Sequence, residues 1–189
     1  MKAVIREQIV EQLMRLPAIV DQYLAHDSHF IGNTLRWMRE TEEKLQSSRL
    51  PIVSEISTLR GLIAATDEGY TEPHVVTAQK SSRKTRRVMV MHLLRSAEQT
   101  LREQATQIDR EFDDFKDKLS QLLAVASAKK PLPAPKAIDT LYLDKVWALL
   151  KDSPENKNLY FYLQARLPET DRRYLLQDLL HHLLQPGGN

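Results

Sequence analysis

Six cationic residues near the middle of the chain are the strongest candidates for chemistry. Residues 73–97 hold all six and no acidic residue, although the whole chain has a formal net charge of only +2. Several of them open a predicted helix, where cations oppose the helix macrodipole and a bound anion would stabilise them. We therefore predict an anion-binding segment, called the basic segment, that consists of Lys80, Arg83, Lys84, Arg86, Arg87 and Arg95.

Three interpretations of the basic segment remain open. The anion would be the phosphate of DNA or RNA, or it would be the acidic surface of a protein partner. In the third interpretation, the cations bind no ligand and are solvated or paired with acidic residues of the same chain. The basic segment has no interleaved aromatic residues and the net charge of the chain is small, which weakens the nucleic-acid interpretation.

The second candidate is a pair of residues within the same stretch, Arg87 and His92. Four residues separate them, and five separate Arg86 from the same histidine. This spacing resembles the Arg-x4-6-His motif of HEPN-type helical ribonucleases. The resemblance implies that His92 would be a general acid and base and that Arg87 would hold the phosphate. No other residue set suggests catalysis, so an enzyme is the less favoured interpretation.

The histidines do not predict a metal site. Two pairs have close spacing, His26 with His29 and His181 with His182, but neither has carboxylates in a Glu-x-x-His arrangement. The chain has no cysteine, which excludes disulfides and thiolate ligands. We therefore expect no metal and no cofactor.

One long helix must position the basic segment and His92. Over residues 83–127 the apolar residues recur with an average period of 3.6, and no glycine or proline interrupts them. A helix of roughly 45 residues is about 65 Å long, so other helices or another chain must cover its apolar stripe. The period differs from 3.5, which predicts a coiled-coil-like helix with little supercoiling. The stripe consists of Val90, Leu94, Ala97, Leu101, Ala105, Ile108, Phe112, Phe115, Leu119, Leu122 and Ala126.

Three shorter helices precede the long one and complete an N-terminal helical bundle over residues 1–128. Pro17 lies inside the first of them, so we expect a kink or break near Leu16. Residues 67–82 are predicted to form a loop between the third helix and the long one. The three helices are expected at about residues 3–26, 28–48 and 51–66.

A proline-rich linker is predicted at residues 129–138, because three prolines fall within 131–135. The remaining residues, 139–185, have the apolar spacing of short helices and predict a small C-terminal helical module. The fold class is therefore all-α: a helical bundle built around one long helix, plus this module. We place the domain boundary at the linker.

The apolar stripe predicts an interaction surface, because the first three helices are too short to cover it. Its later part is left for the C-terminal module or for another chain. Tyr160 lies in an aromatic run that covers more than one helix face, and we expect it to face outward. The predicted partner interface consists of Phe112, Phe115, Leu119, Leu122 and Tyr160.

These patterns favour a non-enzymatic subunit that assembles with another protein chain or with copies of itself in a complex. A nucleic-acid-associated subunit using residues 80–95 is the alternative, and an HEPN-like ribonuclease is the second alternative. Charges near the N-terminus replace the apolar run of a signal peptide, and no stretch approaches the ~20 apolar residues of a membrane span. We therefore expect a cytoplasmic protein without membrane partners.

Overall fold

The computed structural model describes all residues except 69–81, 134, 136 and 185–189, and over the described residues it is helical without strands. The all-α fold class is therefore confirmed, including a long helix of 47 residues. Two short 3-10 helices, η1 (Gln46–Ser48) and η2 (Pro154–Asn156), accompany the α-helices. The α-helices are α1 (Lys2–Leu24), α2 (Phe30–Leu45), α3 (Pro51–Glu68), α4 (Arg83–Lys129), α5 (Thr140–Lys151), α6 (Lys157–Arg166) and α7 (Glu169–Leu184).

The chain forms two compact units, and α4 contributes to both. The N-terminal unit is Val4–Thr106, and the C-terminal unit is Met1–Ala3 together with Gln107–Asn189. This division falls within α4, whereas the sequence placed the boundary at the proline-rich linker. The physical reason is the apolar stripe, which continues beyond residue 107 and is covered there by helices that follow the linker.

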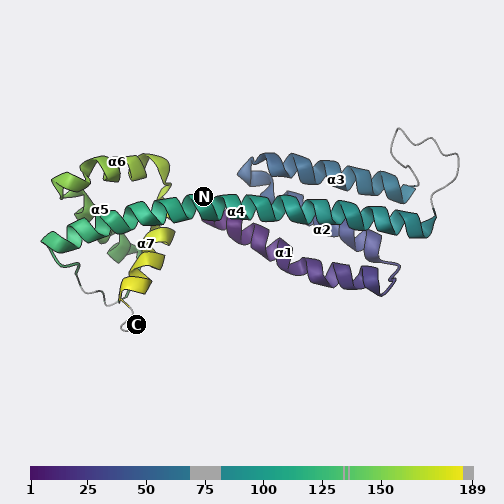
Figure 1. The fold of residues 1–189 in the computed structure, drawn as a ribbon, viewed down its shortest axis with the longest axis horizontal. Helices are drawn as coiled ribbons and strands as arrows, with labels where there is room; N and C mark the ends of the chain where they lie inside the picture. The colour runs from purple at the N-terminus through teal and green to yellow at the C-terminus, as the bar shows by residue number, and fades with distance from the viewer. Residues whose placement is uncertain (69–81, 134, 136, 185–189) are drawn as a thin grey trace. The chain divides into compact units, whose positions relative to one another are not determined.

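In the N-terminal unit, α1, α2 and α3 lie along the first part of α4 (Figure 1). Trp37 on α2 is buried, and its Nε1 donates a hydrogen bond to the Gln12 carbonyl of α1 over 3.0 Å. Helix α1 passes Pro17 without the break predicted near Leu16. The largest side chains of this core are Ile9, Phe30, Trp37, Met38, Leu45, Ile56, Ile63, Leu94 and Leu101.

In the C-terminal unit, α5, α6 and α7 surround the second part of α4 (Figure 1). Asp139 caps α5, since its side chain accepts a hydrogen bond from the Tyr142 N–H over 2.8 Å. Asn156 is buried and its Nδ2 donates to the carbonyls of Leu122 on α4 and Leu150 on α5, over 3.1 and 3.3 Å. None of the helices in the described residues has the length and apolarity needed to cross a membrane.

The first turn of α1 belongs to the C-terminal unit because Asp171 of α7 caps it. The carboxylate of Asp171 is buried and accepts hydrogen bonds from the Lys2 and Ala3 N–H groups over 2.8 and 3.0 Å. N–H groups in the first turn of a helix have no partner within the helix, so a carboxylate supplied from a distant element satisfies them. The start of the chain is thereby held to α7.

Replacing Asp171 with alanine should lower the free energy of unfolding of the C-terminal unit by about 1–2 kcal/mol, since two N–H groups lose their acceptor. Urea unfolding in a Trp37→Phe background, in which Trp147 is the only tryptophan, measures this change by fluorescence. Thr170→Ala is the matched control, because Thr170 is the exposed neighbour of Asp171 on the same helix. Equal stability of the two variants would contradict the capping role.

Candidate functional site

The basic segment begins α4, as predicted, but its members have different environments. Lys80 lies outside the described residues. Arg83, Lys84 and Arg95 are exposed, whereas Arg86 is half-buried and Arg87 is buried. The structure therefore does not present the basic segment as one continuous cationic surface.

Arg87 is a structural residue that caps the C-terminal end of α1. Its side chain is only 8% exposed. Its guanidinium donates hydrogen bonds to the carbonyl oxygens of Tyr23, at 2.9 Å, Gln22, at 3.3 Å, and Asp27. The guanidinium carbon also lies 5.1 Å from the ring centroid of Phe30. The Gln22 and Tyr23 carbonyls also accept the N–H groups of Asp27 and His26, and Arg87 adds a charged donor at this helix end.

Arg86 has the same role for α3. Its Nη1 donates a hydrogen bond to the carbonyl oxygen of Asp67, in the last turn of α3, over 2.8 Å. Helix C-termini carry partial negative charge, so cations on α4 stabilise the neighbouring helices that end beside its first turns. Two cations of the basic segment are thus explained by the fold of the N-terminal unit, without a ligand.

The remaining free cations of the first turn of α4 border an open recess between α4 and the end of α1. Arg83 and Lys84 form no ion pair among the described residues, and Ser82 caps this helix end by accepting the Thr85 N–H over 3.1 Å. Electrostatic attraction of an anion is possible here, but the buried donor groups of Arg87 already bind carbonyls of α1. The recess is lined by Tyr23, His26, Arg83, Lys84, Arg87 and Val88.

The structure does not combine Arg87 and His92 in one site. Arg87 is buried against the end of α1, whereas His92 is exposed. Five residues along a helix correspond to a rotation of roughly 140° between two side chains, which explains their different environments. The arrangement therefore lends no geometric support to the ribonuclease resemblance.

Histidine and carboxylate side chains do not form a metal site in the described part of the chain, where no group of three or more suitable ligands was found. His26 and His29 are exposed, and His26 ends α1 in a left-handed conformation with φ of 56°. His181 and His182 are exposed on α7. Each pair is surface-located.

The predicted partner interface on α4 is mostly internal packing of the C-terminal unit. Phe112, Leu119 and Leu122 are buried, and Phe115 is half-buried. The ring of Phe112 lies 5.9 Å from that of Tyr174 on α7. The sequence predicted that either the C-terminal module or another chain covers this part of the stripe, and over these residues the helices of the same chain cover it.

Tyr160 is also buried, contrary to the expectation that it faces outward. It is 5% exposed, and its ring stacks on that of Trp147 with 4.4 Å between centroids. Burial raises the pKa of the Tyr160 phenol above its usual value. Tyr160 and Leu163 are three residues apart on α6 and share one face, and both are buried, as is Leu167 directly after the helix.

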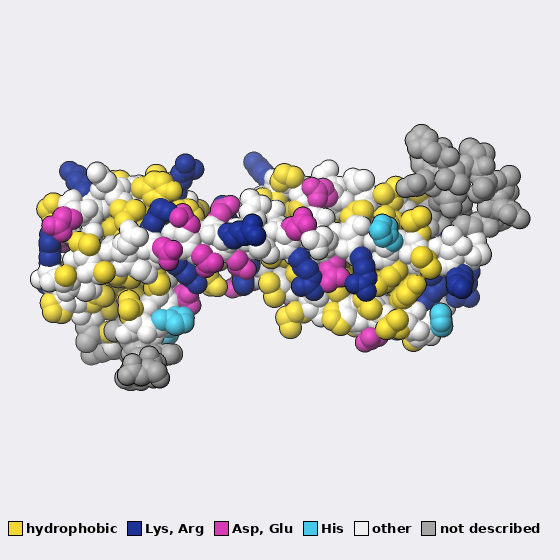
Figure 2. Space-filling model, viewed as in Figure 1, with side chains coloured by type: hydrophobic (Ala, Val, Ile, Leu, Met, Phe, Trp, Pro, Cys, Tyr) yellow, Lys and Arg dark blue, Asp and Glu magenta, His cyan; other side chains and the backbone are white. Residues whose placement is uncertain are grey.

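Within this aromatic run, sequence reasoning missed the two residues that face outward, Phe161 and Tyr162. They are 46% and 41% exposed on α6. The signal that could have found them is the same spacing, because the face opposite Tyr160 and Leu163 must then carry their neighbours. Figure 2 shows hydrophobic side chains over α6, with Lys or Arg side chains on either side of them. We call this surface the α6 face, and it consists of Lys157, Phe161, Tyr162, Ala165 and Arg166.

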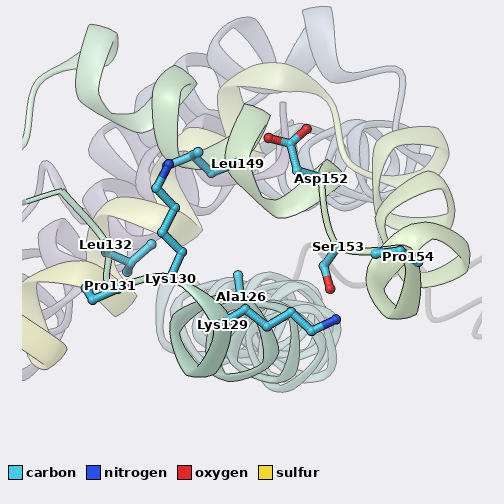
Figure 3. A pocket seen from close by; sticks show the side chains of 9 residues that line it. All are labelled: Ala126, Lys129, Lys130, Pro131, Leu132, Leu149, Asp152, Ser153 and Pro154. Carbon is cyan, nitrogen blue, oxygen red and sulfur yellow. The ribbon is translucent and has the colours of Figure 1, made fainter.

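A small recess at the end of α4 does not bring polar groups together (Figure 3). Its volume is about 150 Å³, which is room for a few water molecules. The side chains of Lys129 and Lys130 extend in different directions in Figure 3, so their ammonium groups do not form one anion site. The Ser153 hydroxyl is buried at its edge without a protein partner among the described residues. Such a recess suits ordered water better than a substrate.

Comparison with known proteins adds no relative to this description. No family model, curated protein or solved structure matches the chain. We therefore infer function from the surface that the chain itself presents, and the α6 face is the most informative part of it.

Proposed function

We propose that the protein is a non-enzymatic interaction subunit that binds another protein chain through the α6 face. The single observation that carries this proposal is the exposure of Phe161 and Tyr162 side by side on a helix whose opposite face is already packed. Neither ring is needed to fill the core, because Tyr160 and Leu163 occupy the inward positions.

Aromatic residues are the side chains most enriched in protein interfaces relative to the rest of the surface. They provide a large contact area at a small cost in conformational entropy, since only two side-chain torsions must be fixed. Isolated exposed apolar residues are common on any protein, whereas Phe161 and Tyr162 are exposed at consecutive positions of one helix. Burial of these two rings against a partner is therefore favourable.

Co-purification tests the proposal. The full-length chain and the double variant Phe161→Ser/Tyr162→Ser are each recovered from the native cell after mild cross-linking. We expect a stoichiometric protein partner, or a second copy of the chain, with the parent protein and its loss with the double variant. Leu141→Ser is the control, because Leu141 is an exposed apolar residue of the same unit, 64% exposed on α5.

Two outcomes would overturn the proposal. One is a chain that remains a monomer in light scattering and carries no stoichiometric protein after cross-linking. The other is a partner that is retained equally by the double variant and by the Leu141→Ser control. Nucleic acid that co-purifies and is released by salt would instead favour a nucleic-acid-associated subunit.

A further inference from the structure

We infer that the partner of the α6 face is an acidic amphipathic segment, in which apolar side chains are flanked by Asp or Glu. This inference rests on the proposed function and adds the chemistry of the partner. It is carried by the charges that border the two exposed rings, together with the way those rings already pack.

Helix α6 carries cations at both ends and no acidic residue. Lys157 lies in its first turn and Arg166 in its last, and neither forms an ion pair among the described residues. Lys157 is placed against the helix macrodipole, so the fold of α6 alone does not favour a cation there. An acidic partner would provide the missing counter-charge.

The spacing on α6 defines what the partner must match. Lys157 and Phe161 are four residues apart, as are Tyr162 and Arg166, so two neighbouring rows each pair one ring with one cation. The two cations are separated by about 13 Å along the helix axis. A partner helix would place its apolar residues on the rings and its acidic residues about two turns apart.

A third cation borders the same surface from α4. The Lys118 ammonium lies 5.8 Å from the centroid of the Tyr162 ring, and it also pairs with Asp114. One side of Tyr162 is therefore in contact with a positive charge before any partner binds. The Asp114 carboxylate offsets much of the Lys118 charge, so Lys157 and Arg166 are the cations on this surface that would disfavour a basic partner.

The packing of the rings favours a protein segment over single-stranded nucleic acid. Bases need open ring faces on which to stack. The Lys118 ammonium lies over the Tyr162 ring, so one face of that ring is not open to a base. Lys and Arg residues of the C-terminal unit also barely outnumber its Asp and Glu residues, whereas nucleic-acid-binding domains are usually strongly basic.

Selection from a phage-displayed library of random peptides tests the inference on the full-length chain. We expect the enriched peptides to combine Asp or Glu with aromatic or aliphatic residues. A selected peptide, made synthetically and measured by fluorescence anisotropy, should bind about tenfold more weakly to Phe161→Ser/Tyr162→Ser. Lys157→Glu/Arg166→Glu should weaken binding several-fold and reduce its salt dependence, while Leu141→Ser should bind like the parent.

Enriched peptides without an excess of Asp or Glu, or binding that is unaffected by Lys157→Glu/Arg166→Glu, would overturn the inference. A labelled oligo(dT) strand that competes with the selected peptide for the same residues would also overturn the inference. Failure of this inference can be distinguished from failure of the proposed function. A cellular partner lost with Phe161→Ser/Tyr162→Ser but retained with Lys157→Glu/Arg166→Glu would support the proposed function and overturn the acidic-partner inference. All substituted residues are exposed, and circular dichroism of each variant checks that the helices are retained.

Discussion

Replacing Arg87 with alanine is expected to lower the free energy of unfolding of the N-terminal unit by about 3 kcal/mol. The guanidinium is buried and donates to three carbonyl oxygens around the end of α1. Alanine would remove the charged donor from all three, although the Gln22 and Tyr23 carbonyls would keep their backbone donors from Asp27 and His26. The contact with the Phe30 ring would be lost at the same time.

Urea unfolding measures this effect in a Trp147→Phe background, in which Trp37 is the only tryptophan and reports on the N-terminal unit. Arg83→Ala is the matched control, because Arg83 is an exposed cation one turn earlier on α4, and we expect it to change stability by less than about 0.5 kcal/mol. Arg87→Lys should fall between the two, since one ammonium cannot replace the planar set of donors. If Arg87→Ala were as stable as Arg83→Ala, the capping role would be refuted.

The basic segment shows what could and could not be predicted from the sequence. Periodicity located the start of α4 correctly. Arg86 and Arg87 do lie in its first turns, where cations oppose the helix macrodipole. The counter-charge, however, is the chain's own helix ends, with the acceptors of Arg87 at least 60 residues away in sequence. Such contacts depend on which helix ends lie next to one another in the folded chain, and the local spacing of residues contains no information about this arrangement.

The fold was predictable to the extent that it depends on local patterns. A 3.6-residue period without glycine or proline predicted a helix over 83–127, and α4 spans Arg83–Lys129. The division into units was not predictable in this way, because proline composition identifies a connecting segment and not the set of helices that share a core. Most of the predicted loop 67–82 lies outside the described residues.

For the aromatic run on α6, the expectation that one face packs inside and another faces outward was correct, but the residue predicted to face outward was wrong. One face had to pack inside, but the choice of Tyr160 as the outward residue ignored its spacing to Leu163 and Leu167. Tyr160 and Leu163 share one face of α6 and Leu167 is buried directly after the helix, so Phe161 and Tyr162 are left outward. The candidate contact residues are therefore Phe161 and Tyr162 in place of Tyr160. The expectation that an aromatic residue of this helix contacts a partner stays a prediction.

Replacing Leu122 with alanine is expected to lower the free energy of unfolding of the C-terminal unit by about 3 kcal/mol, because it leaves a cavity in a packed core. Leu122 is fully buried, and its carbonyl accepts a hydrogen bond from Asn156. Urea unfolding in a Trp37→Phe background measures the change, since Trp147 then reports on the C-terminal unit alone. Gln121→Ala is the matched control, because Gln121 is the exposed neighbour of Leu122.

The comparison separates two explanations of the same apolar stripe. If the chain covers the stripe itself, Leu122→Ala loses stability in the pure protein and Gln121→Ala does not. If the stripe is instead reserved for a partner, both variants should unfold at the same urea concentration while only Leu122→Ala loses the partner. Because the helices of the C-terminal unit bury Phe112, Leu119 and Leu122, we expect the first result. The α6 face then remains the surface of this unit that we propose for binding another chain.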